Sequence, residues 1–457
     1  MSLASRPARP AVELADDPPR RGRPPLRNEI LRRGRLGGFE AAELADRYGT
    51  PFYVYDLDVV GRQVDVLRAA LPAAFDLAYA IKANPSLGVV AHVASLGIGA
   101  DVASGGELAT ALAAGVPAET IVMTGPGKRD EELAAAIAAG VRAVTVESPR
   151  ELERLEAIAA RTGIRVPVLF RAAVSPEARL ERVRLVGDDG GGKFGMDADD
   201  LAAAAGHAVR SAYLDPMGLH AFGASNVLDA NALADHVAAT VAHARELAVG
   251  AGFPLRLVDA GGGLGIPYEA HEESLDLVGL GRTLSGLASE WARDPLLRDT
   301  QLLLEPGRFL VGPAGAYVAR VVDRKSVDGR EVVILDGGIH HVLRPALVGQ
   351  EHRVRRLRSG GADDRDAVGR FVPVTVAGPL CSGLDVLATE AMMGAPEPGD
   401  LMAVLDVGAY GFTESMPFFL SHPMPPEVAI KGGRSATLRP RLEPAGWLAQ
   451  QRLPDWS

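Results

Sequence analysis

An alternation of short apolar segments with alanine-rich amphipathic segments runs from about residue 55 to residue 310 and limits the possible folds more than any other feature. Short apolar runs bounded by polar residues predict buried strands, and the segments between them predict helices. The predicted strands are 77–81, 99–102, 120–123, 143–146, 166–170, 217–222, 256–260 and 301–305, and the helices between them include 86–95, 105–114, 129–139, 149–161, 198–211 and 230–251. Strand–helix repeats over about 250 residues match the length of a TIM-type (β/α)8 barrel.

A doubly wound open sheet is the alternative, but its glycine-rich turn should follow the first strand, whereas the glycine run of this chain lies near residue 261. Beyond residue 312 the pattern changes to β-type runs without long helices, at 316–322, 331–335, 371–377 and 401–405. This pattern predicts an all-β domain, which we expect the strand-like segment 51–55 to join. The predicted fold class is therefore α/β, with a lead-in segment over 37–55, a barrel over 56–311 and a C-terminal all-β domain over 312–457.

Residues 1–36 hold nine Arg, six Pro and four acidic residues and lack the apolar core of a signal peptide. This composition predicts a disordered or loosely docked tail, and the glycine-rich segment 187–192 predicts a mobile loop. A net charge of −10 argues against general nucleic-acid binding, and we find no apolar run of about 18 residues that could span a membrane. The single cysteine suits a reducing compartment, so we expect a cytoplasmic protein.

Polar residues and a glycine recur at the C-terminal ends of the predicted strands, where a barrel of this kind places its active residues. They are Lys82, Asp101, Glu147, Arg171, His220, Gly261 and Glu305. Lys82 ends its apolar run just before the turn pair Asn84-Pro85. A desolvated lysine there can be nucleophilic at neutral pH and form a Schiff base, although a surface lysine that ends a strand is the simpler alternative.

Two further motifs follow late strands of the predicted barrel. The run Asp259-Ala-Gly261-Gly-Gly263 can expose backbone N–H groups as an anion cradle, which favours phosphate binding over a merely flexible loop. The motif Glu305-Pro-Gly-Arg308 places a carboxylate and a guanidinium on one turn. Glutamate can hold a pyridinium N–H and arginine can hold an anion, while a local ion pair is the alternative.

The C-terminal part carries three more candidates. Cys381 lies in a loop punctuated by Gly and Pro, which favours an exposed, reactive thiol over a buried one. Tyr410 stands between two small residues after a strand, where a packed aromatic is the alternative. His340 and His341 should point to opposite faces of a strand, and no ligand cluster matches them, so we expect no metal.

Together these segments resemble the fold-type III pyridoxal-phosphate decarboxylases, which include the diaminopimelate, ornithine and arginine decarboxylases. The resemblance extends from about Phe52 to Glu427. Its markers are Tyr79-Ala-Ile-Lys82-Ala-Asn84, Asp101-Val-Ala-Ser104-Gly-Gly-Glu107, Lys193-Phe-Gly195, Gly261-Gly-Gly263, Glu305-Pro-Gly-Arg308, Gly378-Pro-Leu-Cys381 and Gly408-Ala-Tyr410-Gly411. It implies an alanine-racemase-like pairing of barrel and β domain, a pyridoxal 5′-phosphate cofactor, and a homodimer with shared active sites.

The resemblance also implies a role for individual residues. Lys82 would bind the cofactor as a Schiff base, Glu305 would face the pyridine nitrogen, and Cys381 would protonate the carbanion in the neighbouring subunit's site. The implied cofactor-binding residues are Lys82, Asp101, Phe222, Ser225, Gly262, Gly263, Glu305, Gly307, Arg308 and Tyr410. The implied substrate-binding residues are Arg308, Arg344, Ser382 and Tyr410.

The sequence departs from the family pattern at three positions. Phe222 stands where a histidine usually stacks over the cofactor ring. Ser382 stands where an acidic residue of the ornithine and diaminopimelate enzymes binds the substrate's distal ammonium, and Val348 replaces a tyrosine of the diaminopimelate enzymes. A diamine-forming substrate would lose a charge pair worth about 2–5 kcal/mol if buried.

With these departures, the sequence most resembles a specialised-metabolism branch of the family. This branch includes the decarboxylase of butirosin biosynthesis, which acts on glutamate linked to a carrier protein. We therefore predict decarboxylation of an L-amino acid or of a carrier-tethered aminoacyl group in secondary metabolism. Diaminopimelate decarboxylation is the first alternative. A racemase and a non-catalytic homologue are further alternatives, but Cys381 argues against the racemase, and Lys82, Glu305 and Arg308 argue against a non-catalytic protein.

Overall fold

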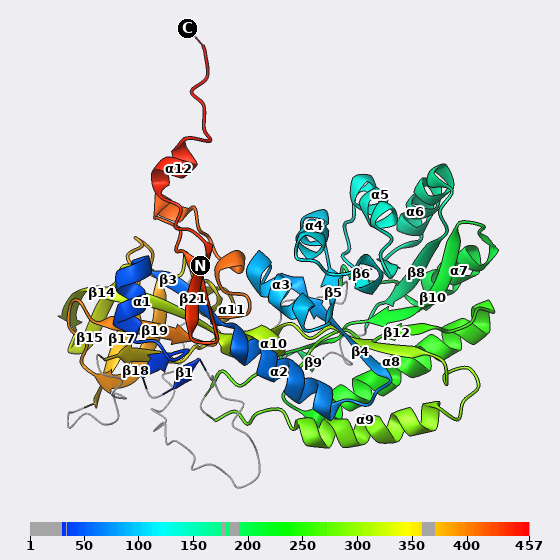
Figure 1. The fold of residues 1–457 in the computed structure, drawn as a ribbon, viewed down its shortest axis with the longest axis horizontal. Helices are drawn as coiled ribbons and strands as arrows, with labels where there is room; N and C mark the ends of the chain where they lie inside the picture. The colour runs from blue at the N-terminus through cyan, green and yellow to red at the C-terminus, as the bar shows by residue number, and fades with distance from the viewer. Residues whose placement is uncertain are drawn as a thin grey trace.

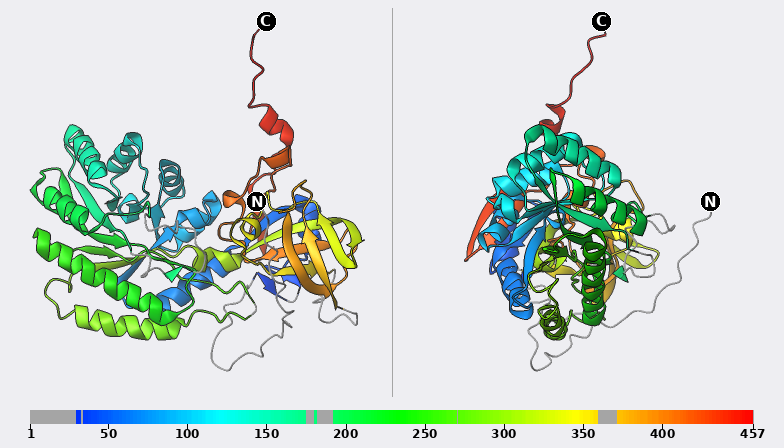
Figure 2. Two further views of the ribbon diagram at one scale, coloured as in Figure 1. Left: turned by 180° about the vertical axis from the view of Figure 1, so that it is seen from behind. Right: turned by 90° about the vertical axis from the view of Figure 1, so that its right-hand side faces the viewer.

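The computed structural model describes residues 30–32, 34–174, 180–181, 192–269, 271–358 and 371–456 of the 457-residue chain. Most of the predicted tail and residues 187–191 of the predicted mobile loop lie outside the described residues. Figure 1 shows two parts side by side, a barrel surrounded by helices and a β domain. The residues after α12 (Pro444–Leu448) project away from both parts in every view (Figures 1 and 2).

A closed barrel of eight parallel strands confirms the predicted architecture. Around the barrel the order is β4 (Phe75–Ala80), β5 (Gly99–Val102), β6 (Ile121–Met123), β7 (Ala143–Val146), β8 (Val166–Ala172), β10 (Leu214–Ala221), β12 (Leu257–Asp259) and β13 (Gln301–Leu304), which pairs with β4 again. Strand β4 begins and ends before its predicted bounds, so Lys82 follows the strand within a short 3₁₀ turn, Ile81–Ala83.

Amphipathic helices cover the outside of the barrel, as the right-hand view of Figure 2 shows. They are α2 (Leu57–Ala70), α3 (Leu87–Ser95), α4 (Gly105–Ala113), α5 (Asp130–Ala139), α6 (Pro149–Thr162), α7 (Ala198–Arg210), α8 (Ala230–Ala251) and α9 (Leu277–Trp291). Strands β6, β7 and β12 are buried along their whole length, because their inner faces fill the barrel and their outer faces meet the helices. None of the described helices is long and apolar enough to cross a membrane.

The barrel interior changes from apolar to polar along the strands. A separate cluster of buried apolar residues fills its lower layer: Ala78, Val122, Ala143, Leu169, Leu257 and Leu303. Because side chains alternate along a strand, the residue two positions further on faces the interior again. In six strands that residue is Ala80, Thr124, Thr145, Arg171, Asp259 or Glu305. The strand sequences therefore place a polar layer at the C-terminal mouth of the barrel.

The β domain is built on a mixed sheet whose order is β18-β17-β15-β14-β3-β20-β21, with β19 and β16 branching from β14. These strands are β3 (Phe52–Asp56), β14 (Gly315–Val327), β15 (Arg330–Leu335), β16 (Val354–Leu357), β17 (Phe371–Ala377), β18 (Val386–Gly394), β19 (Leu401–Leu405), β20 (Glu427–Lys431) and β21 (Arg434–Arg439). Strand β3 pairs with β14 and β20, so a segment that precedes the barrel in sequence belongs to this sheet.

Two hydrogen bonds join the β domain to the mouth of the barrel. The side-chain amide of Asn84 donates to the Gly408 carbonyl at 2.9 Å, and the Tyr410 N–H donates to the Ala83 carbonyl at 2.8 Å. The segment that carries Tyr410 therefore lies directly against the turn that carries Lys82.

Candidate active site

Lys82 lies at the open mouth of the barrel and forms an ion pair. Its Nζ lies 2.9 Å from Oδ2 of Asp101, and the other carboxylate oxygen of Asp101 accepts a hydrogen bond from Thr124 at 2.6 Å. The Lys82 side chain is 40% exposed, but burial is the largest influence on the pKa of its ammonium, so the amine is partly removed from water. The 3₁₀ turn after β4 carries Lys82 between the buried residues Ile81 and Ala83.

The charge of Lys82 follows from its neighbours. Burial lowers the pKa of the Lys82 ammonium, but Asp101 and then Glu305 raise it, and the net shift is upward. Lys82 is therefore a cation in the cofactor-free chain, and it must lose a proton before it can act as a nucleophile.

The turn around Lys82 is held in place from three directions. Tyr79 donates a hydrogen bond to the Asn84 carbonyl at 3.0 Å, and Asn84 is tied to the β domain. A Cβ atom at Gly307 would lie 2.9 Å from the Cβ of Ala83. Only glycine therefore allows the Glu305–Arg308 turn to approach Lys82 this closely.

Three buried groups face one another beneath Lys82. His220, Asp259 and Glu305 each offer a donor atom, and these atoms lie within 4.8 Å of one another. Oε1 of Glu305, Oδ2 of Asp259 and both ring nitrogens of His220 have no hydrogen-bond partner within the described chain. Burial, followed by Asp101 and Asp259, raises the pKa of Glu305 well above its usual value, while burial lowers the pKa of His220.

This arrangement fits a cofactor that brings a buried nitrogen. An unpartnered carboxylate oxygen at the centre of a barrel can accept a hydrogen bond from the N–H of a pyridinium ring, which would satisfy both groups. The same three donors could in principle hold a metal ion, as could the partly exposed group Glu269, His271 and Glu272.

A glycine cradle lies beside these groups. Gly261 and Gly263 have φ values of 67° and 107°, which glycine adopts without strain. A Cβ atom at Gly262 would lie 2.5 Å from the Glu305 carbonyl oxygen, so no other residue fits between the two loops. The Val227 N–H donates to the Gly263 carbonyl at 2.8 Å, which brings the strand β11 (Ala224–Ser225) close to the cradle. Ser225 and these glycines can together hold a phosphate group.

Phe222 lies between the glycine cradle and Lys82. A Cβ atom at Gly261 would lie 2.8 Å from Cδ2 of Phe222, and the Lys82 Nζ lies 5.6 Å from the centre of the Phe222 ring. A phenyl ring at this place can stack on a planar cofactor but cannot donate a hydrogen bond.

Tyr410 is placed between two arginines on the β-domain side of the site. The guanidinium carbons of Arg308 and Arg344 lie 4.7 Å and 4.5 Å from the centre of its ring. Tyr410 has a φ of 54°, a conformation that is uncommon for a non-glycine residue and that clusters at functional sites. Arg308 also donates to the hydroxyl of Tyr268 at 2.8 Å.

Cys381 and Ser382 lie in the loop between β17 and β18, and Cys381 is exposed. Asp385 holds this loop in shape, because its carboxylate accepts hydrogen bonds from the Leu380 and Ile339 N–H groups, both at 2.7 Å. Within the described residues, no hydrogen bond or ion pair joins Cys381 or Ser382 to the barrel mouth. Contacts within the described chain therefore tie the other predicted site residues to the barrel mouth but show none between it and this pair.

The expectation that His340 and His341 point to opposite faces of a strand was wrong. His340 and His341 lie in a turn after the glycines that follow β15, and their rings are only 3.7 Å apart instead of facing opposite ways. Gly337 and Gly338 end the strand there, because a Cβ at either position would lie about 2 Å from Tyr317 or Asp385.

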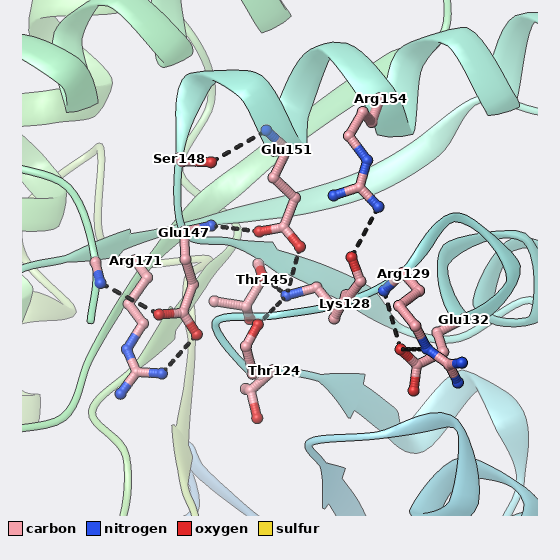
Figure 3. Close-up of polar contacts among 12 residues, drawn as sticks. Thr124, Lys128, Arg129, Glu132, Thr145, Glu147, Ser148, Glu151, Arg154 and Arg171 are labelled. Carbon is pink, nitrogen blue, oxygen red and sulfur yellow. Dashed lines mark hydrogen bonds and ion pairs between the residues drawn. The ribbon is translucent and has the colours of Figure 1, made fainter. Parts of the chain in front are cut away.

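A second lysine, Lys128, also follows a barrel strand, but its side chain is enclosed by the protein, unlike that of Lys82 (Figure 3). Lys128 Nζ donates to the carbonyls of Gly125 and Thr145 at 2.6 Å and 2.8 Å and lies 3.0 Å from Glu151. Its side chain is 1% exposed, so all three of its donors are used within the protein. The sequence analysis overlooked Lys128, although its place after β6 is a signal comparable to that of Lys82.

The network around Lys128 continues to the barrel mouth. Arg171 donates to Glu147 at 2.7 Å, and the same carboxylate accepts from the Gly195 N–H at 3.2 Å (Figure 3). The Arg171 guanidinium also lies over the ring of Phe194, 4.6 Å from its centre. These contacts fix the Lys193-Phe194-Gly195 motif against the barrel.

Comparison with known proteins identifies the relatives of this arrangement. Residues 57–312 match the pyridoxal-binding domain of the pyridoxal-dependent decarboxylases. The chain is 33% identical to the L-glutamyl-[BtrI acyl-carrier protein] decarboxylase of Niallia circulans over 407 residues, 88% of this chain and 93% of that protein. It is 31% identical to the diaminopimelate decarboxylase of Helicobacter pylori over 408 residues, 88% of this chain and 96% of that protein.

Solved structures agree with these matches. The crystal structure of diaminopimelate decarboxylase from Helicobacter pylori in complex with L-lysine superposes with a TM-score of 0.79 at 28% identity, covering 90% of this chain and 98% of that one. The diaminopimelate decarboxylase from M. jannaschii gives a TM-score of 0.82 at 27% identity, covering 92% and 96%.

Proposed function

Because this chain belongs to the pyridoxal-dependent decarboxylase family, we propose that it removes the α-carboxyl group of an amino acid whose far end is joined to a carrier protein. The coarser part of this assignment, a pyridoxal 5′-phosphate-dependent amino-acid decarboxylase, follows from the family itself. The carrier-linked substrate is the proposal. We place the reaction in the biosynthesis of a secondary metabolite.

The residues of the site fit the cofactor in this proposal. Bound pyridoxal phosphate supplies a ring that accepts the electrons released when CO2 leaves. Lys82 would bind the cofactor, Glu305 would accept a hydrogen bond from its ring nitrogen, and Ser225 with Gly261–Gly263 would hold its phosphate. Phe222, Arg308 and Tyr410 would line the remaining sides of the site. The buried position of Glu305 would keep water away from that nitrogen.

Ser382 is the observation that carries the choice of substrate. The resemblance places an acidic residue here in enzymes that bind a distal ammonium, whereas Ser382 is neutral. A substrate with a free distal ammonium would lose its ionic partner, while a substrate joined to a carrier protein has no such group. The 33% identical relative, which is named for a carrier-linked glutamyl group, supports the same choice.

Diaminopimelate decarboxylation is the second candidate. Several relatives bear that name, and the resemblance to the family implies that Arg344 binds substrate. The two candidates differ in what they require at the distal end of the substrate, so one screen separates them.

Measurement of CO2 release from a panel of substrates tests the proposed function. We expect the holoenzyme to decarboxylate an L-glutamyl group on an acyl carrier protein at least about tenfold faster, in kcat/KM, than free L-lysine, L-ornithine or meso-diaminopimelate. Protein freed of cofactor is the control, since it should release no CO2 from any of them. Release from free diaminopimelate at the rate of the carrier-linked substrate would establish the second candidate instead.

We also propose that the active site is completed by Cys381 from a second copy of the chain. The exposure of Cys381, and the shared active sites that the family resemblance implies, motivate this proposal. Mixing the Lys82→Ala and Cys381→Ala variants should recover about a quarter of wild-type activity, since half of the dimers are mixed and each of these has one intact site. The activity of the mixture would equal the average of the two variants alone if each site lay within one chain.

A further inference from the structure

The charge of Arg344 is paired within its own chain. Its Nε lies 2.8 Å from Oε2 of Glu414, and one terminal nitrogen donates to the other Glu414 oxygen at 3.2 Å. The second terminal nitrogen donates to Oε1 of Gln350 at 3.1 Å. Glu414 therefore pairs with the guanidinium through one hydrogen bond and one close charge contact, and Gln350 accepts a second hydrogen bond.

The orientation of Gln350 is fixed from behind by His352. One ring nitrogen of His352, Nδ1, lies 2.9 Å from the Leu405 carbonyl and must donate to it. Nε2 of the neutral ring is then an acceptor, and the Gln350 amide nitrogen lies 3.0 Å away as its donor. The Gln350 oxygen is therefore directed at Arg344. The hydrogen bond to His352 fixes the orientation of the Gln350 amide that this contact requires.

The two arginines that stack on Tyr410, Arg308 and Arg344, differ in how many of their donors are free to bind a ligand. Among the described residues, the Arg308 guanidinium makes one hydrogen bond, to Tyr268, and keeps donors for an anion in the site. The Arg344 side chain is only 2% exposed, and a carboxylate that is 27% exposed neutralises it. Burial and then Arg308 lower the pKa of Arg344, while Glu414 opposes them.

We propose that Glu414 is a specificity-determining residue that occupies Arg344 and thereby selects substrates whose distal end is an uncharged ester, thioester or amide. The inference rests on the proposed function, because it concerns the substrate of the same site. A distal carboxylate would have to compete with Glu414 for Arg344, and it would be repelled by the same carboxylate. A carboxyl group masked by its link to a carrier meets neither obstacle.

Equilibrium binding to the holoenzyme tests this selection, with the change in cofactor absorbance on amine binding as the readout. The probes are L-glutamate, its γ-methyl ester and L-glutamine, which differ mainly in the charge of the distal group. We expect the wild-type protein to bind the ester and the amide about 10- to 100-fold more tightly than L-glutamate, the range for one hydrogen bond to a charged group.

Substitution of Glu414 should change this ratio. Glu414→Gln keeps the shape of the side chain but frees the Arg344 charge, so affinity for L-glutamate should rise about tenfold while affinity for the ester stays constant. Glu414→Asp keeps the charge and should keep the wild-type ratio. Glu331→Gln is the matched control, because Glu331 also pairs with an arginine at 2.9 Å and is 29% exposed, but it lies in β15.

The binding measurements can contradict this inference whether or not the protein is catalytically active. Equal binding of L-glutamate and its ester by the wild-type protein would contradict it, and this comparison needs no variant to fold. An unchanged ratio in a folded Glu414→Gln variant would also contradict it. Absence of CO2 from every amino acid, free or carrier-linked, would instead refute the proposed function and leave the binding preference standing.

Discussion

Replacement of Lys82 by alanine is expected to lower decarboxylation by at least about 10³-fold, because the variant loses the amine that anchors the cofactor. The fold should survive, since the Lys82 side chain is 40% exposed and its backbone turn is held by Tyr79, Asn84 and Gly307. CO2 release measures the effect, and borohydride treatment followed by mass spectrometry checks its cause. The wild-type protein should retain the cofactor covalently after reduction, whereas the variant should not.

Two lysines serve as comparisons for this result. Lys325→Ala removes an exposed lysine from β14 and should leave both activity and cofactor attachment unchanged. Lys128 should carry no cofactor after reduction of the wild-type protein, because its three donors are already used. Cofactor attached at Lys128, or normal activity in Lys82→Ala, would contradict the assignment of the site.

Substitution of Glu305 by glutamine is expected to reduce kcat by about 10²- to 10³-fold, the usual loss for one buried electrostatic partner of a reacting group. Burial, followed by Asp101 and Asp259, raises the pKa of Glu305 well above its usual value. A carboxylate facing the ring nitrogen can keep that nitrogen protonated, whereas an amide cannot. The ring of the variant would therefore accept electrons less readily.

Steady-state kinetics and the absorption spectrum of the bound cofactor together measure the effect of Glu305→Gln. The loss should appear in kcat more than in KM, since the partner acts on the ring and not on the distal end of the substrate. Glu290→Gln, an exposed glutamate at the end of α9, is the control for a lost carboxylate. An unchanged kcat and spectrum in Glu305→Gln would remove Glu305 from the mechanism.

Much of the fold could be predicted because it depends on local patterns. Apolar runs with the right spacing predicted all eight barrel strands, and polar residues at six of the strand ends predicted a polar mouth. Errors arose where a backbone turn changed the direction of a side chain. The turn that carries His340 and His341 brought together two rings that a strand would have separated.

By itself, the sequence determined the barrel, the polar residues at the C-terminal ends of its strands, and the family. These features follow from residues that are close together in the chain. Lys82 and Lys128 both follow barrel strands. Only the tertiary structure decided that the Lys82 side chain is partly exposed and that the Lys128 side chain is buried. It also decided that Glu414 neutralises Arg344 across 70 residues of sequence. Such pairings depend on barrel closure and on the placement of the β domain, and no local pattern encodes the distance between residues that far apart.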